Sequence, residues 1–387
     1  MKWGIVMKIT DVKSYLVSPT GVFVKIETDE GICGYGEATI HYFPQSVAAM
    51  IQDMKGYLVG EDPQRIEYIW QSLFRDMFMR GGPVHCAAIS GIDMALWDIK
   101  GKYYNAPVYQ LLGGLVRDRV RLYGHVAGKS AEEIAKKAKA LADTGVTMIR
   151  FRGFHDYDEK RLHDHSLAVE QQLEYLEAIR NAVGYGVDLI VECHGRYDPQ
   201  WAIKLAQEAK KFKPFFIEDP IRHENPQAMA VVRQHTDVPL AIGERGHNKW
   251  DFRELIVNNY VDYVRPDICH CGGITEMRKI AAMAETFYIS LVPHNTQGPL
   301  AYAAAMHAAF AIDNVAVVEA AFVNPVNIAN TNFVKPWPEF KDGYALPPKG
   351  PGLGIEFNEE AIIEATQKFK ARTQPRLRGL DGSVRDW

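Results

Sequence analysis

Short apolar runs alternate with amphipathic helical patterns through the middle of the chain. Each run is followed by apolar positions spaced three to four residues apart, which is typical of a strand followed by a helix. The predicted strands are residues 120–126, 148–154, 189–194, 215–218, 240–244, 263–267, 289–294 and 316–319. Strands that alternate with helices form a parallel sheet, so eight of them predict an α/β fold of the (β/α) barrel type.

The two ends of the chain have different patterns. Residues 7–40 predict a β-meander, because two apolar runs are followed by the turn Asp29-Glu30-Gly31 and a glycine-rich strand. Residues 45–112 have helical spacing, and the chain after residue 330 is rich in proline and glycine. We predict an α+β domain at 1–118, a barrel at 119–330 and a segment at 331–387 that packs back on the first domain.

Three helix starts in the barrel carry residues that favour capping. Ser130 precedes Glu133 in a capping-box pattern. Asp198 and Asn225 each precede a proline, which is favoured at the first position of a helix. We therefore expect all three side chains to cap the helices that follow them.

Composition limits the classes of function. The chain has 387 residues, 47% of them hydrophobic, and a formal net charge of −4 without basic clusters, so we expect neither nucleic acid nor a membrane as a partner. No signal-peptide pattern or membrane-spanning run is present, which predicts a cytoplasmic protein. Five cysteines suit neither a disulfide framework nor a zinc site, and we interpret them as reduced structural thiols.

Carboxylates follow three consecutive predicted strands. Glu192, Glu218 and Glu244 are evenly spaced, one strand-helix unit apart. One such glutamate is most simply a salt bridge at the barrel rim, but three convergent anions need a compensating cation. Oxygen ligands of this kind suit Mg²⁺, so we predict a magnesium site on these three residues.

Two histidines lie at equivalent strand ends. His194 is two residues after Glu192, so both side chains are expected to point into the barrel mouth. His294 follows the strand next to that of Asp267, which predicts an Asp–His pair with a basic imidazole. We interpret the other histidines considered as structural: His125, His155, His163, His165, His223, His235 and His247.

Two imidazoles beside a chelated carboxylic acid suggest one base and one acid. A metal bound to the acid stabilises the charge left when the α-proton is removed, and a second histidine protonates a departing β-hydroxyl. This chemistry is a dehydration.

An ordered set of motifs now indicates a family. They are E-C-H-G-R at 192–196, F-I-E-D-P at 216–220, I-G-E-R at 242–245, R-P-D-I-C-H-C-G-G-I-T at 265–275, V-P-H-N at 292–295, V-E at 318–319, A-L-W-D-I-K-G-K at 95–102 and L-L-G-G at 111–114. Together they resemble the mandelate-racemase branch of the enolase superfamily. Within it, carboxylate-x-His on the third strand and G-L-G-I-E-F at 352–357 are similar to galactonate dehydratase and mannonate-dehydratase-like proteins.

The resemblance implies a (β/α)7β barrel of the TIM type with a capping domain formed by both chain ends. It implies Mg²⁺ on the three glutamates, a His294–Asp267 base and His194 as the acid. Glu319 is expected to bind the substrate near its carboxylate, with Arg152, Arg245 and Asn295 as further substrate-binding residues. The enzyme would be a carbon–oxygen lyase acting on a small sugar acid, and the family suggests a homo-oligomer.

Two departures from the family pattern affect this interpretation. The place of a K-x-K motif is held by Arg150 and Arg152, whose guanidinium groups stay protonated and do not serve as ordinary bases. The first metal ligand is usually Asp in these dehydratases, whereas here it is Glu192, one methylene longer.

Specificity is expected in loops around 19–22, 41–43 and 154–166, and the last is either a substrate-covering lid or a solvated loop. Two alternatives to a dehydratase remain open. One is a racemase or epimerase on the same scaffold. The other is a relative that binds a sugar acid without turning it over.

Overall fold

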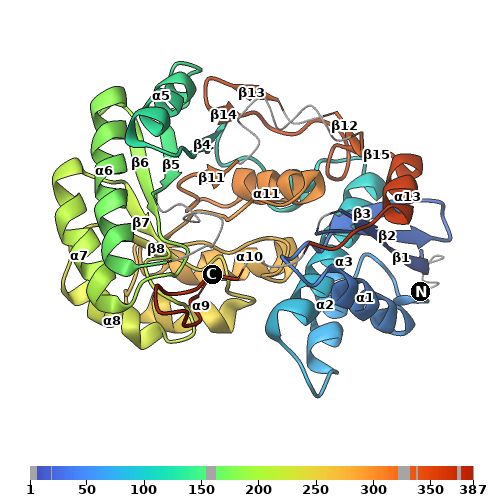
Figure 1. The fold of residues 1–387 in the computed structure, drawn as a ribbon. Helices are drawn as coiled ribbons and strands as arrows, with labels where there is room; N and C mark the ends of the chain where they lie inside the picture. Colours follow the sequence, from blue (N-terminus) through green and yellow to red (C-terminus); the bar gives the residue numbers. More distant parts are fainter. Residues whose placement is uncertain are drawn as a thin grey trace.

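The protein has two parts that meet along one face (Figure 1). The computed structural model describes residues 7–18, 20–153, 163–320, 332–336, 339–372 and 376–386. Within these ranges no helix combines the length and the apolar character needed to cross a membrane. The first part is an antiparallel sheet with helices, and the second is a barrel of parallel strands.

The N-terminal sheet is the predicted β-meander. Strands β1 (Ile9–Val17), β2 (Gly21–Thr28) and β3 (Cys33–Glu37) pair antiparallel in chain order. The helices that follow are α1 (Pro44–Leu58), α2 (Ile66–Arg75), α3 (Gly82–Tyr103) and α4 (Val108–Leu111). A Cβ at Gly36 would lie 2.0 Å from the carbonyl oxygen of Gly91, so glycine is what lets α3 approach β3 this closely.

All eight predicted barrel strands are present. They are β4 (Val120–Val126), β5 (Met148–Arg152), β6 (Asp188–Glu192), β7 (Phe216–Glu218), β8 (Leu240–Ile242), β9 (Tyr263–Val264), β10 (Ser290–Leu291) and β11 (Val318–Glu319). Consecutive strands from β4 to β10 pair in parallel, and β11 pairs with β4. The amide of Leu291 donates to the carbonyl of Asn314 at 2.8 Å, which joins β10 to the chain entering β11 and closes the barrel.

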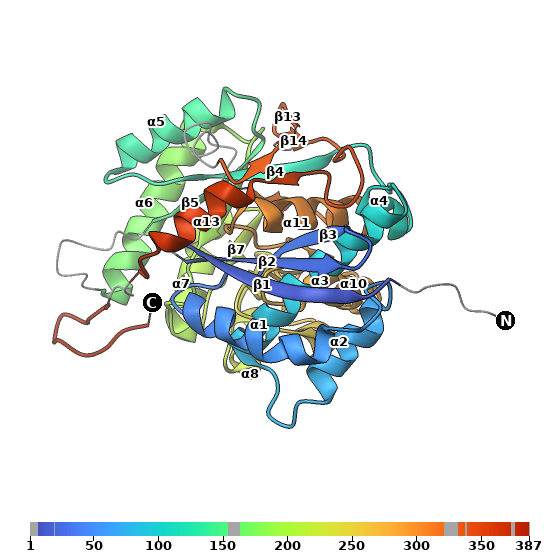
Figure 2. The same ribbon diagram turned by 90° about the vertical axis from the view of Figure 1, so that its right-hand side faces the viewer.

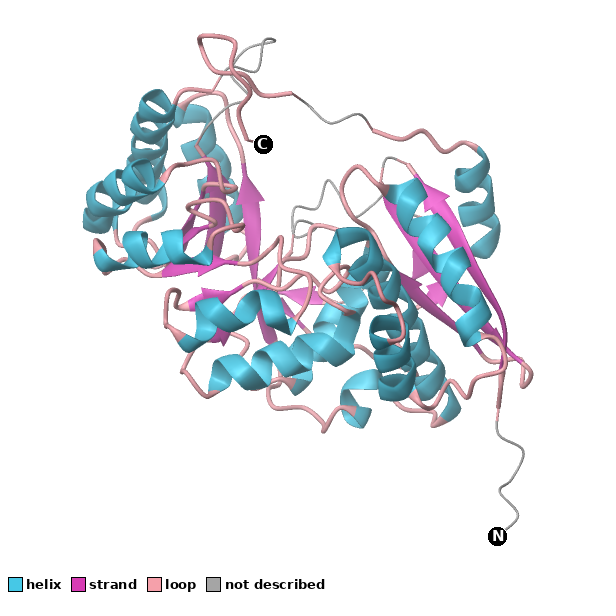
Figure 3. Cartoon of the chain, turned by 90° about the horizontal axis from the view of Figure 1, so that it is seen from below, coloured by secondary structure: helices cyan, strands magenta, loops and turns pink. Residues whose placement is uncertain are grey.

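Seven helices alternate with the strands, as the periodicity predicts. They are α5 (Ala131–Ala142), α6 (His165–Val183), α7 (Pro199–Ala209), α8 (Pro226–Gln234), α9 (Lys249–Val257), α10 (Gly273–Glu285) and α11 (Pro299–Ala311). They lie outside the strands (Figure 3). Inside the barrel a buried apolar cluster takes residues from the strands or from the turns beside them: Tyr123, Met148, Ile190, Phe216, Ala241, Val292 and Val317.

The C-terminal segment contacts both parts. Its elements are β12 (Val334–Lys335), β13 (Phe340–Lys341), β14 (Tyr344–Ala345), β15 (Glu356–Phe357) and α13 (Glu359–Gln367), and β14 pairs antiparallel with β4 of the barrel. Helix α13 lies beside the N-terminal sheet (Figure 2). There Glu359 accepts hydrogen bonds from Tyr15 at 2.6 Å and Lys25 at 2.8 Å. The domain limits at 118 and 330 stay predictions, and residue 330 lies outside the described residues.

Two of the three predicted helix caps are confirmed. Ser130 accepts a hydrogen bond from the amide of Glu133, and Asn225 accepts one from the amide of Gln227, both at 3.2 Å. The prediction for Asp198 is wrong, because its side chain makes no cap bond. Its carboxylate pairs with Arg222 instead, and an ion pair competes directly with the weaker bond to a backbone amide.

Candidate active site

A cavity of about 630 Å³ opens where the C-terminal ends of the barrel strands face the N-terminal domain. The N-terminal domain contributes the backbone turn that follows β3, with His41, Tyr42 and Phe43. Residues 41–43 thus line the cavity, and their expected part in specificity stays a prediction. Histidines from both parts line the cavity: His41, His125, His194, His223, His247, His270 and His294.

The three predicted metal ligands lie near this cavity at different levels. Glu192 and Glu218 end β6 and β7 and are directly paired in the register. Glu218 also pairs with Ala241, so Glu244 lies beyond the end of β8, after Gly243 with its φ of +134°. Equal spacing in the sequence therefore did not give equal depth in the barrel, because the strand-helix units differ in their loops.

Two groups of three ligand atoms lie here, and within each group the atoms are no more than 4.8 Å apart; Glu192 belongs to both groups. One group is Glu192, Glu218 and Asp219, and the other is Glu192, His194 and Glu244. Oε2 of Glu218 is buried without a hydrogen-bond partner among the described residues. A buried carboxylate oxygen with no partner is costly, and the donors are mainly hard oxygen atoms, so the residues fit a Mg²⁺ ion.

Two arginines balance the charge of these carboxylates. Nε of Arg150 donates to Glu218 at 3.1 Å, and its Nη2 contacts Glu192. Arg265 is fully buried and lies 2.8 Å from Glu218, 3.0 Å from Asp219 and 3.2 Å from Glu244. The acidic cluster is thus held together by two buried guanidinium groups, which satisfies the pairing that buried charges require.

His294 and Asp267 form the predicted pair. Nδ1 of His294 lies 2.6 Å from Oδ2 of Asp267, and Nε2 lies 3.6 Å from Glu244. Burial lowers the pKa of His294, but the charge of Glu319, the bond to Asp267 and the charge of Glu244 outweigh it and raise the pKa to about 9. Asp267 is anchored further by the amide of Cys269 at 2.6 Å and by Gln297 at 3.2 Å.

His194 lies beside the first glutamate for a different reason from the one predicted. Strand β6 ends at Glu192, so strand alternation does not orient His194, which has a φ of +50°. Its amide donates to Glu192 at 2.5 Å, and its Nε2 lies 2.8 Å from Nη2 of Arg150. Burial and then the charge of Arg150 hold the pKa of His194 well below its usual value.

The predicted substrate-binding residues occupy different places. Glu319 is buried, lies 2.7 Å from Nε2 of His125 and accepts from Arg265 at 2.9 Å. Asn295 supports Glu319 through two hydrogen bonds. The backbone amide of Asn295 donates to Oε2 of Glu319 at 3.1 Å, and the side-chain Nδ2 donates to the backbone oxygen of Glu319 at 3.3 Å. Arg245 lines the cavity and donates to the backbone oxygen of His194 at 2.8 Å.

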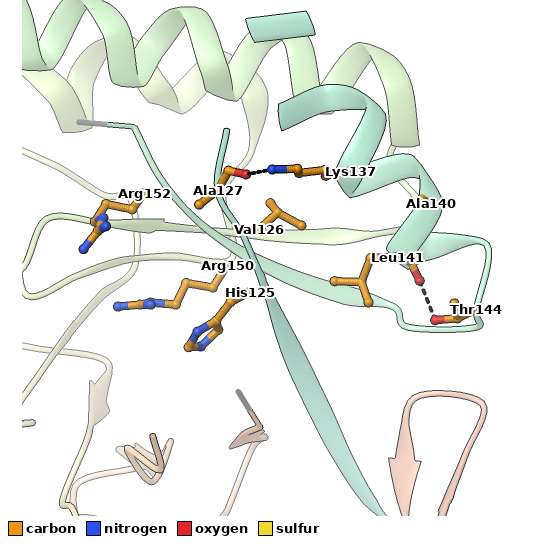
Figure 4. A pocket seen from close by; sticks show the side chains of 9 residues that line it. All are labelled: His125, Val126, Ala127, Lys137, Ala140, Leu141, Thr144, Arg150 and Arg152. Carbon is orange, nitrogen blue, oxygen red and sulfur yellow. Dashed lines mark hydrogen bonds between the residues drawn. The ribbon is translucent and has the colours of Figure 1, made fainter. Parts of the chain in front are cut away.

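Arg152 lines a neighbouring cavity rather than the one that holds His194 and His294. That cavity, of about 680 Å³, shares Arg150 and His125 with the first. Figure 4 shows the guanidinium groups of Arg150 and Arg152 extending toward the same side of β5. The role of Arg152, like the roles of the other site residues, stays a prediction.

Sequence reasoning missed several residues of the site. His125, His223 and His247, which we interpret from the sequence as structural, line the cavity, and their role stays a prediction. Arg265, Asp219 and His270 were not singled out, although each is within three residues of a predicted site residue in the sequence. Their closeness in the sequence to predicted site residues at the strand ends was the signal that could have identified them as site residues. Of the expected specificity loops, residues 154–162 and residue 19 lie outside the described residues.

Comparisons with known proteins agree with this architecture. Residues 8–113 match the model of the mandelate racemase/muconate lactonizing enzyme N-terminal domain, and residues 133–361 match the enolase C-terminal domain-like model. D-galactonate dehydratases of Ralstonia pickettii and Pectobacterium atrosepticum are each 38% identical over 98% of this chain and 100% of their own.

Solved structures extend the similarity. An enolase from Pantoea ananatis with bound D-gluconate and Mg superposes with a TM-score of 0.88 at 33% identity, covering 98% of this chain and 99% of that one. A member of the enolase superfamily from Salmonella Typhimurium gives 0.86 at 32% identity, covering 92% and 98%. The chain therefore belongs to the mandelate racemase/muconate lactonizing enzyme family of the enolase superfamily.

Proposed function

We propose that this protein is a Mg²⁺-dependent acid-sugar dehydratase. It removes the C2 proton and the 3-hydroxyl of an aldonic acid of the galactonate, mannonate or gluconate type and releases a 2-keto-3-deoxy acid. The observation that carries the proposal is the presence in one cavity of His294, paired with Asp267, and His194, which adjoins the acidic cluster.

The relatives support this class of reaction. The two relatives from Ralstonia and Pectobacterium are named D-galactonate dehydratases, which are carbon–oxygen lyases. The Pantoea neighbour holds D-gluconate and Mg. A racemase that takes its bases from the second barrel strand has less support, because Arg150 and Arg152 stand there and remain protonated.

Each residue has a defined part in the proposed reaction. Glu192, Glu218 and Glu244 would hold Mg²⁺, and the bound ion would stabilise the negative charge that develops on the substrate carboxylate. Nε2 of His294 takes the C2 proton, while Asp267 fixes the imidazole through Nδ1. His194 gives a proton to the departing 3-hydroxyl, which leaves as water, and the resulting enol tautomerises to the 2-keto acid.

A substrate screen tests the proposal. Purified protein with Mg²⁺ is incubated with a library of aldonic and aldaric acids, and the products are assayed for 2-keto-3-deoxy acids. We expect at least one aldonic acid to be dehydrated, and exhaustive chelation to abolish the reaction. An epimer as the product would contradict the dehydratase assignment, and undiminished turnover after chelation would contradict the metal site.

A further inference from the structure

A separate cavity of about 640 Å³ lies between the N-terminal domain and the barrel. One wall comes from the start of α2 and from Trp97 and Lys100 of α3, and the other from Arg278 and Lys279 of α10. It shares no lining residue with the cavity that holds His194 and His294. Its function is therefore a question distinct from the proposed reaction.

The lining carries more positive than negative charge. Glu67 neutralises Lys279, with their charged atoms 2.6 Å apart. Lys100 donates to the backbone oxygen of Gln64 and Arg278 donates to the backbone oxygen of Leu112, both at 3.4 Å. In the part of the chain that the structure describes, neither cation has a carboxylate within ion-pair distance. Two cations, one from each domain, thus line the cavity without a carboxylate partner among the described residues.

A second, independent feature is the side chain of Gln64. Both Oε1 and Nε2 are buried, and neither has a hydrogen-bond partner among the described residues. An amide group removed from water without partners costs free energy that a bound polar molecule recovers. Next to it, the indole of Trp97 is fixed by a 2.9 Å bond to Thr275 and forms a rigid apolar surface, with Nζ of Lys100 5.5 Å from its centroid.

We propose that this cavity binds a small organic anion with phosphate or carboxylate groups. Lys100 and Arg278 would pair with its acidic groups from opposite walls, and the side chain of Gln64 would turn toward the cavity to hydrogen-bond its polar body. Because the walls belong to different domains, the bound anion would join the N-terminal domain to the barrel. It binds only the folded arrangement and so stabilises it.

Isothermal titration calorimetry of the Mg²⁺-loaded protein tests the site at constant ionic strength. The probes are inorganic phosphate, glycerol 2-phosphate and glutarate, with glycerol as the uncharged control. We expect one or more of the anions to bind and glycerol not to bind. Binding of the phosphates alone identifies a phosphate site, and binding of glutarate alone identifies a carboxylate site. If none of the three anions binds, the proposal is wrong.

Variants locate the binding. Lys100→Gln and Arg278→Gln are each expected to weaken it about tenfold, the effect of losing one charge-assisted hydrogen bond. Lys204→Gln is the matched control, because Lys204 also lies over a tryptophan, with Nζ 5.7 Å from the ring of Trp201. If all three variants bind the anion as tightly as the parent protein does, the anion binds elsewhere and the proposal is wrong. Since the readout is binding, it is independent of whether the dehydratase assignment holds.

Discussion

At the scale of single residues, the two histidines have electrostatic environments opposite to each other. His294 faces Glu244 and Glu319, and its pKa is raised to about 9. His194 is buried beside Arg150, and burial and then that charge lower its pKa. A base must be neutral and an acid must be protonated before the reaction. The raised pKa of His294 therefore opposes its proposed role as the base, and the lowered pKa of His194 opposes its proposed role as the acid. A cation bound to Glu244 would offset part of the charge that makes His294 basic.

Deuterium exchange at C2 therefore tests the assignment of both residues. His294→Asn should stop exchange with heavy water and product formation, because neither begins without the base. His194→Gln should slow dehydration by about 100- to 10,000-fold but keep exchange, because the base is intact. Proton NMR of the substrate measures both. The control is His235→Gln, on an exposed histidine outside the cavity. Exchange lost in His194→Gln and kept in His294→Asn would reverse the roles.

Glu192 is the most connected of the proposed ligands, since it belongs to both groups of donor atoms. Glu192→Asp should keep part of the activity, because the shorter acid is what similar enzymes use at this place. Glu192→Gln should lose metal affinity, because an amide oxygen carries no net charge to bind the cation. Calorimetric titration with Mg²⁺ measures the affinity of each variant. Full affinity in Glu192→Gln would make this residue structural.

The residue-level predictions succeeded where position in a strand determined the contact. Glu192 and Glu218 were predictable as neighbours because parallel strands in register bring their ends together. Arg265 was not, because it contacts Glu218, Asp219 and Glu244 only through the length of its side chain. The cavity positions of His223 and His247 depend on loops after the strand ends, whose path apolar periodicity does not encode.

At the scale of elements, α11 is capped by another domain. Its first residues have no side-chain cap of their own, since Gly298 precedes the helix. Glu37, at the end of β3, accepts from the amides of Gly298 at 2.7 Å and Ala301 at 3.0 Å. Gly298 follows the loop that carries His294, so this carboxylate joins the N-terminal domain to the loop of the proposed base.

The pKa of Glu37 predicts how this contact responds to pH. Burial raises the pKa to about 7, against the opposing hydrogen bonds of Thr39 and the two amides. Because the folded pKa lies above the unfolded value, the stability contribution is full below about pH 4.5 and is lost as pH rises through 7. The thermal midpoint of Glu37→Gln should therefore fall less than that of the parent between pH 5 and pH 8. A parallel fall in both proteins would contradict the assignment.

The order of the elements was largely predictable, and their lengths were not. Apolar runs identified all eight barrel strands, because strands buried on both faces must be apolar throughout. Of the predicted strand 289–294, only Ser290–Leu291 forms a regular strand; Pro293 lacks an amide to donate, and pairing resumes at the single bridge between His294 and Asp267. Contacts between distant elements, such as Glu37 with α11, leave no local pattern from which to predict them.

At the scale of the whole molecule, the proposed metal site depends on barrel closure. Its carboxylates come from three consecutive units, and Arg265 links Glu218 and Glu244 to Glu319 of the last strand. The unfolded chain brings none of these residues together. A cation that binds the folded barrel alone must therefore raise the stability of the protein, by about 2.7 kcal/mol at a free concentration 100 times Kd.

Thermal unfolding at increasing Mg²⁺ concentration tests this linkage. The midpoint of the parent protein should rise steadily with the logarithm of the concentration, and that of Glu218→Gln should respond far less, because one charged ligand is lost. Glu276→Gln is the matched control, since Glu276 is buried and paired with Lys249 at 2.8 Å but is not one of the proposed ligands. It should lower the midpoint while keeping the dependence on Mg²⁺. An undiminished rise in Glu218→Gln would show that Mg²⁺ binds elsewhere. All scans need one heating rate, because a protein of this size can unfold irreversibly.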